Sequence, residues 1–138
     1  KFEAGTQRVS QAVAFAAAVC YLQHLGMENV EAWEHELGAR LVEGVQKIEG
    51  VRLLGPTDPT KRAGLVALAI EGVHPHDVGQ LLDTQGIAVR VGHHCAQPLH
   101  RCAGVTASTR ASTYIYNTTE DVDAFLKALA EVRPYFGL

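Results

Sequence analysis

The chain is short of cysteine, aromatic residues and net charge, and these shortages exclude several classes of protein. Only 3 of its 138 residues are cysteine, and 7% are aromatic. So few cysteines, in odd number, form no disulfide framework, so we expect a reducing, cytoplasmic location. Twelve basic residues against fifteen acidic ones give a net charge of −3. That balance lacks the basic excess of a dedicated nucleic-acid binder, so no nucleic-acid partner is expected.

The chain also lacks a long apolar segment. Its longest apolar run, residues 12–20, is shorter than the ~18–20 residues of a membrane span, so we expect no membrane contact. The sequence begins with Lys1 and shows no signal-peptide pattern, so we expect the C-terminal part of a longer chain. With 138 residues, 47% of them hydrophobic, it matches one packed domain. We therefore predict a single domain over residues 1–138.

Hydrophobic spacing predicts an α+β fold, with helices packed on a small sheet in the order α-α-β-β-α-β-β-α. Asn29 is predicted to cap the second helix and Gly50 to stop it. The predicted strand at 65–70 is apolar throughout, so both its faces should be covered. The predicted helices cover 10–25, 30–49, 75–85 and 119–132, and the predicted strands cover 51–54, 65–70, 87–91 and 108–116.

Between the last two predicted strands lies a stretch that packing does not explain. Residues 90–100 read RVGHHCAQPLH. Cationic neighbours favour the thiolate, the nucleophilic form of cysteine, so Arg90, His93 and His94 make Cys95 a candidate nucleophile. A metal site there is disfavoured because adjacent side chains diverge and no second ligand cluster exists. A Cys–His hydrolase is a further option, but no residue stands out to orient the histidine.

The remaining candidates are one arginine and the other cysteines and histidines. Arg110 interrupts an apolar and hydroxyl-rich strand pattern, where a guanidinium group needs a carboxylate partner. The residues alone leave open whether that carboxylate is an internal Asp or Glu or part of a substrate. Cys20, in an Ala/Val helix face, is predicted to be buried, and Cys102 to be structural. The other histidines are predicted to lie on helix surfaces, His24 and His35, or in loops and caps, His74 and His76.

Several motifs resemble the C-terminal part of a pyridoxal-phosphate-dependent cysteine desulfurase of the SUF type, the group that includes selenocysteine lyases. They occur in the family's order along nearly the whole chain, and RxGHHC is the most specific of them. The resemblance implies the small C-terminal domain of a fold-type I enzyme, similar to class V aminotransferases. The matching segments are FEAGT at 2–6, GIAVR at 86–90, GHHCA at 92–96, PL at 98–99, RAS at 110–112 and YNT at 116–118.

The resemblance implies that L-cysteine is converted to L-alanine, with the sulfur held as an enzyme persulfide for iron–sulfur cluster assembly. It assigns the nucleophile to Cys95, the substrate carboxylate to Arg110, and the cofactor phosphate of the partner subunit in a homodimer to Thr6. Arg90, His93 and His94 match the supporting loop. It implies a sulfur-acceptor protein of the SUF system as partner. From the residues themselves we expect no metal.

One feature departs from the family. The cofactor needs a Schiff-base lysine in a Ser/Thr-x-His-Lys context, and none of the lysines has it: Lys1, Lys47, Lys61 and Lys127. The family keeps this lysine in a preceding domain, so we expect these 138 residues alone to be inactive. A catalytically incomplete, stand-alone interaction module that docks a sulfur acceptor is the alternative. A related lyase, epimerase or kynureninase-like enzyme is a third hypothesis, against which the intact GHHC element counts.

Overall fold

The computed structural model describes residue 2 and residues 4–138. The chain forms two compact units, residues 1–32 and residues 33–138. The boundary falls inside a continuous helix, so the single domain predicted for residues 1–138 stays a prediction.

The first unit contains helix α1, Val9–Leu25, as predicted, and the start of helix α2, Met27–Gln46. Gly26, at φ 84°, separates the two helices. The predicted cap at Asn29 is wrong, because α2 begins two residues earlier and the side-chain Nδ2 of Asn29 donates to the Leu25 carbonyl at 2.8 Å. No residue of α1 is buried, so the prediction of a buried Cys20 is also wrong.

Among the described residues, no single helix is long and apolar enough to cross a membrane. Only α1 and α2 taken together, as a bent pair, meet that requirement of length and composition.

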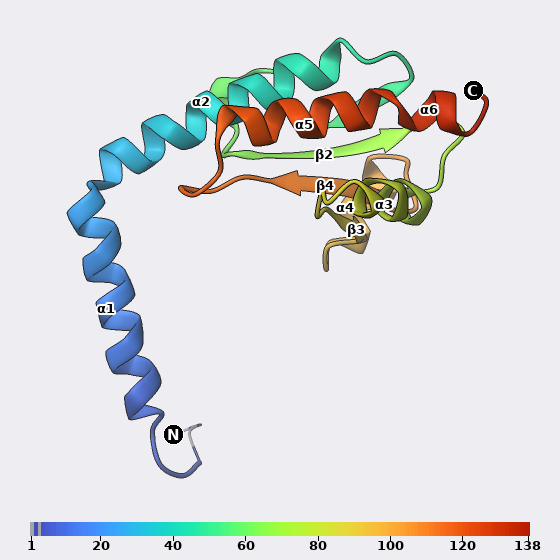
Figure 1. Cartoon of the computed structure of the whole chain (residues 1–138). Coiled ribbons are helices and arrows are strands. Elements are labelled where there is room, and N and C mark those ends of the chain that lie inside the picture. The colour runs from blue at the N-terminus through green and yellow to red at the C-terminus, as the bar shows by residue number, and fades with distance from the viewer. Residues whose placement is uncertain (1, 3) are drawn as a thin grey trace. The chain divides into compact units, whose positions relative to one another are not determined.

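The second unit is built on a four-stranded antiparallel sheet in the order β1-β2-β4-β3. Helices α2 and α5 lie on the same side of strand β2 (Figure 1). Trp33 in α2 donates from its indole nitrogen to the Asn117 carbonyl ahead of α5, at 3.1 Å. After α2 the elements are β1 Val51–Leu54, the 3-10 helix η1 Pro59–Lys61, β2 Leu65–Ile70, α3 Pro75–Thr84, β3 Arg90–Gly92, α4 Gln97–Cys102, β4 Ser108–Ser112, α5 Thr119–Ala130 and α6 Val132–Tyr135.

The two faces of this sheet differ. Alternate side chains of a strand point to opposite faces, and directly paired residues share a face. Leu68 and its partner Thr109 are buried on the face that meets the helices, which we call the core face. Ala67 and its partner Arg110 lie on the opposite, open face and are half-buried. The prediction that both faces of β2 are covered is therefore wrong within the described structure, and the open face is available for a site.

The largest differences from prediction lie around the last two strands. Strand β3 covers residues 90–92 rather than 87–91, and β4 ends at Ser112 rather than Tyr116. The short helix α4 between them was not predicted, because six residues are too few to show a helical period. The chain is also helical past residue 132, since α6 includes Pro134.

The N-terminus of α5 offers a test of local stability. The Thr118 hydroxyl accepts from the Asp121 amide at 3.3 Å, and the Asp121 carboxylate accepts from the Thr118 amide at 3.0 Å, which forms a capping box. We expect Thr118→Ala to cost about 1 kcal/mol of helix stability. Amide exchange protection in the first turn of α5 should fall about five-fold. Thr57→Ala, in an exposed loop, is the control; equal effects of both variants would contradict the capping role.

Candidate functional site

A cavity of about 310 Å³ lies where the open face of the sheet meets the turn at residues 93–96 and helix α4. Its apolar wall includes Leu54 of β1, Ala67 of β2 and Leu99 of α4. Two of the site residues predicted from the sequence, His94 and Arg110, line the same cavity. The polar side chains that line it are His94, His100, Ser108 and Arg110.

Arg110 has no internal partner in the described part of the chain. Its Nε is buried there without a hydrogen bond, and the described ion pairs are Arg40–Asp123 and Lys61–Asp58. Arg90 stands directly opposite Arg110 on the neighbouring strand β3. Like charges in directly opposed positions destabilise a sheet. The arrangement therefore suits an anionic ligand, and of the two options left open for Arg110 it favours the external carboxylate.

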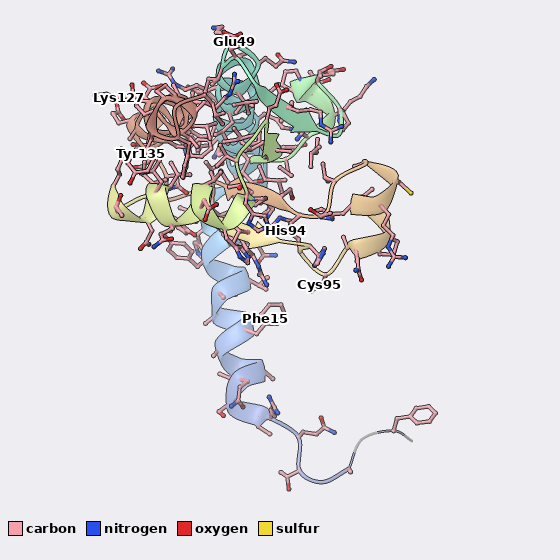
Figure 2. All side chains as sticks on the ribbon, turned by 90° about the vertical axis from the view of Figure 1, so that its right-hand side faces the viewer. Phe15, Glu49, His94, Cys95, Lys127 and Tyr135 are labelled. Carbon is pink, nitrogen blue, oxygen red and sulfur yellow. The ribbon has the colours of Figure 1, made fainter. Side chains whose placement is uncertain are left out.

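Cys95 lies on a tight turn between β3 and α4. The Ala96 amide donates to the His93 carbonyl at 2.8 Å, and the two residues between them have positive φ, 51° at His94 and 59° at Cys95. This pattern is that of a type I′ turn, which normally uses Asn-Gly. The Cys95 side chain is exposed, and Figure 2 shows it at the outer edge of the turn, with His94 nearer the strands. The predicted nucleophile is thus accessible.

His94 is held against the sheet by a buried serine. Its Nε2 lies 3.0 Å from the Ser108 hydroxyl, and that hydroxyl lies 2.9 Å from Nε2 of His100. Nδ1 of His100 lies 3.0 Å from the Ala96 carbonyl. Burial, followed by the charges of Arg110, His100 and Arg90, lowers the pKa of His94. The lowered pKa favours the neutral form of His94. Its buried Nδ1 has no partner among the described residues.

The structure does not bring every predicted site residue into this cavity. Cys95, Arg90 and the exposed His93 lie outside its lining. Thr6 belongs to the other unit, where it is exposed and follows Gly5, at φ 89°. No described lysine lines the cavity.

Two residues of the site were missed by the sequence analysis. His100 is buried at 6% exposure and Ser108 at 0%. His100 follows Ala96 by four positions, which is the reach of one helical turn, but α4 had not been predicted. Cys102 is exposed, so nothing in the described structure supports a structural role. Within residues 2 and 4–138, no three His, Cys, Asp or Glu side chains are grouped to hold a metal ion.

Three of the four other predicted histidine positions are confirmed, and His76 lies in the first turn of α3 rather than in a loop or cap. His24 and His35 are exposed on α1 and α2, and His74 caps α3 by accepting from the His76 amide at 3.3 Å.

Comparison with known proteins identifies the family. The aminotransferase class-V family matches residues 1–125, so the chain belongs to that family. Its fold is that of the small α+β part of fold-type I cysteine desulfurases.

Individual relatives are similar along nearly the whole of this chain. A probable cysteine desulfurase of Halalkalibacterium halodurans is 49% identical over 99% of the chain and 33% of its own length. The solved apo cysteine desulfurase of Thermococcus onnurineus is 40% identical, with a TM-score of 0.91 over 99% of this chain and 34% of its own. A solved cysteine desulfurase of Escherichia coli is 34% identical, with a TM-score of 0.87 over 96% of this chain and 32% of its own. The chain thus spans about a third of the length of these relatives.

Proposed function

We propose that the protein containing this chain is a cysteine desulfurase, in which Arg110 binds the carboxylate of L-cysteine and Cys95 accepts its sulfur. The observation that carries the proposal is Arg110, whose buried Nε has no partner among the described residues and which lines a cavity edged by the Cys95 turn. A planar guanidinium group binds a carboxylate through two parallel hydrogen bonds. The names of the similar proteins support the same activity.

The described residues fit a part of a pyridoxal phosphate site. Arg110, whose buried Nε has no partner among the described residues, fits the carboxylate of a cofactor-bound amino acid. The exposed Thr6 hydroxyl would donate to the cofactor phosphate of the partner subunit. No described lysine lines the cavity, so the lysine that binds the cofactor would come from another part of the protein. When bound, pyridoxal phosphate acts as the electron sink for the substrate amino acid.

The overall reaction balances without an external oxidant or reductant. The Cys95 thiolate attacks the sulfur of L-cysteine, a sulfur–sulfur bond forms, and the carbon–sulfur bond of the substrate breaks. The electron pair of the broken bond stays with the substrate carbon, which takes up a proton and becomes the methyl group of L-alanine. This chain contributes the carboxylate anchor and an exposed thiol on a short turn, so the two reactants are held in place.

The finer assignments belong to the same proposal. We propose a homodimer of the SUF type in the cytoplasm, which passes its persulfide sulfur to an acceptor protein for iron–sulfur cluster assembly. Arg90, His93 and His94 would form the loop around the nucleophile. Because the described cavity has no lysine, we expect residues 1–138 alone neither to hold the cofactor nor to turn over cysteine.

The test is to incubate the full-length protein with L-cysteine and to measure alanine and whole-protein mass. We expect stoichiometric alanine and the addition of sulfur atoms that reducing agents remove and peptide mapping assigns to Cys95. Alanine without sulfur on Cys95, or no alanine from a cofactor-loaded protein, would contradict the proposal.

A further inference from the structure

The turn that carries Cys95 is strained, so the surrounding structure must hold it. His94 and Cys95 both have positive φ, at 51° and 59°, although neither is glycine. Non-glycine residues in this region are strained and persist only where neighbouring contacts fix them. The turn hydrogen bond between Ala96 and His93 is one such contact. The exposed Cys95 side chain forms no disulfide and no hydrogen bond within the described part of the chain that could supply the rest of the constraint.

The remaining constraint reaches the turn through His94. Its ring is hydrogen-bonded to Ser108, a fully buried residue at the start of strand β4. Ser108 also binds His100 in α4, and His100 returns to the carbonyl of Ala96, the last residue of the turn. These contacts close a ring of hydrogen bonds from the turn to the sheet, to α4 and back to the turn. The ring of His100 also packs 5.7 Å from that of His94.

The proton positions in this cycle of hydrogen bonds follow from the contact at the Ala96 carbonyl, whose direction is fixed. A backbone carbonyl only accepts, so Nδ1 of His100 donates to Ala96. When each imidazole carries one proton, Nε2 of His100 is then an acceptor. The single hydroxyl proton of Ser108 therefore points to His100, and the Ser108 oxygen accepts from Nε2 of His94. Every contact has one donor and one acceptor, which fixes the tautomers of both histidines.

We propose that Ser108 and His100 are positioning residues that, through His94, hold the left-handed turn and aim Cys95 at its substrate. Neither side chain is placed to touch the Cys95 thiol, which lies on the outer side of the turn. Ser108 is central to this network, because its one hydroxyl is hydrogen-bonded to the imidazoles of both His94 and His100. Its removal would leave Nε2 of His94 and Nε2 of His100 without partners among the described residues, and the strained turn without its link to β4. This inference rests on the proposed function.

The first test is Ser108→Ala in the full-length, cofactor-loaded protein. Because a misplaced reactive group costs up to about 100-fold in rate, we expect kcat for alanine formation to fall 10- to 100-fold. Arg110 is untouched, so KM for cysteine should stay within about two-fold. Ser112→Ala, an exposed serine of the same strand, is the matched control and should leave both constants unchanged. Unchanged kcat in Ser108→Ala would overturn the proposal, and so would a loss confined to KM.

A second measurement does not depend on activity. In protein labelled with ¹⁵N-histidine, the wild-type spectrum should show the proton on Nδ1 of His100 and on Nε2 of His94. The opposite tautomers, or rapid exchange between both, would overturn the inference. Because this spectrum can be read in a protein that makes no alanine, failure of the network and failure of the proposed function are distinguishable.

A second variant removes the ring contact but keeps the turn. Asparagine adopts positive φ readily, yet it is too short to reach Ser108 as His94 does. His94→Asn should therefore lower kcat by a similar factor without unfolding the loop. Wild-type kcat in this variant would show that the turn alone aims Cys95 and would contradict the positioning role.

Discussion

Replacing Cys95 with serine in the full-length protein should abolish sulfur transfer while leaving the cofactor's visible absorption unchanged. Serine is nearly the same size and keeps the exposed position on the turn, so the fold and Arg110 are undisturbed. Its hydroxyl is a far weaker nucleophile than a thiolate and forms no persulfide. Removal of the attacking group typically costs several orders of magnitude, so alanine formation should fall at least about 10³-fold. The measurement is alanine and protein-bound sulfur over time.

Two other cysteines provide the controls for this experiment. Cys20 on α1 and Cys102 at the end of α4 are both exposed and free, so each is as open to reagents as Cys95. Cys20→Ser and Cys102→Ser should retain wild-type rates and still gain sulfur at Cys95. Normal alanine release by Cys95→Ser would remove the nucleophile assignment, and loss of activity in Cys102→Ser would place the nucleophile on α4 instead.

The long amphipathic and apolar elements of this chain could be predicted because their sequence period matches their structure. Helix α1, strand β2 and the buried stripe of α5 were found at or near their observed positions. The end points of β3 and β4 could not be predicted, because apolar residues continue beyond the hydrogen-bonded part of each strand. Ile87 and Val89 pack against the core as irregular backbone, outside β3.

Some residues of the site could be predicted from their neighbours in the sequence, whereas others depend on contacts between distant parts of the chain. Cys95 and its cationic neighbours lie close together in sequence, so they could be predicted as site residues from the sequence alone. The hydrogen bonds of Ser108 to two imidazoles depend on α4 folding back over the open face of β4, which no local pattern encodes. The positive φ at His94 and Cys95 was also hidden, because His-Cys is not a sequence typical of such a turn.

The role of Arg110 needed the structure as well as the sequence. From the residues alone, an internal carboxylate and a substrate carboxylate were equally good partners. The strand register places Arg90, not an acidic residue, across from Arg110, and the buried Nε has no bond among the described residues. An unpaired buried polar group is costly, so the unpaired Nε of Arg110 favours a partner outside the described residues. The lack of an internal partner among the described residues therefore favours the substrate carboxylate.

Arg110→Met should weaken the use of L-cysteine strongly while sparing the stability of the chain. Losing one partner of a hydrogen-bonded charge pair costs a few kcal/mol, so kcat/KM should fall about 10²- to 10³-fold, mainly through KM. Arg110→Lys keeps the charge but not the two parallel hydrogen bonds, so we expect about a ten-fold loss. Steady-state kinetics with L-cysteine give both values.

The unfolding free energy of the Arg110 variants distinguishes a role of Arg110 in substrate binding from a role in stabilising the fold. Because Arg110 faces Arg90 and has no internal ion pair in the described structure, Arg110→Met should change the unfolding free energy by no more than about 0.5 kcal/mol. Arg101→Met, an exposed arginine on α4, is the control for loss of one positive charge and should leave KM unchanged. A marked loss of stability in Arg110→Met with an unchanged KM would mean that the guanidinium group serves the fold, and that the carboxylate of the substrate is bound elsewhere.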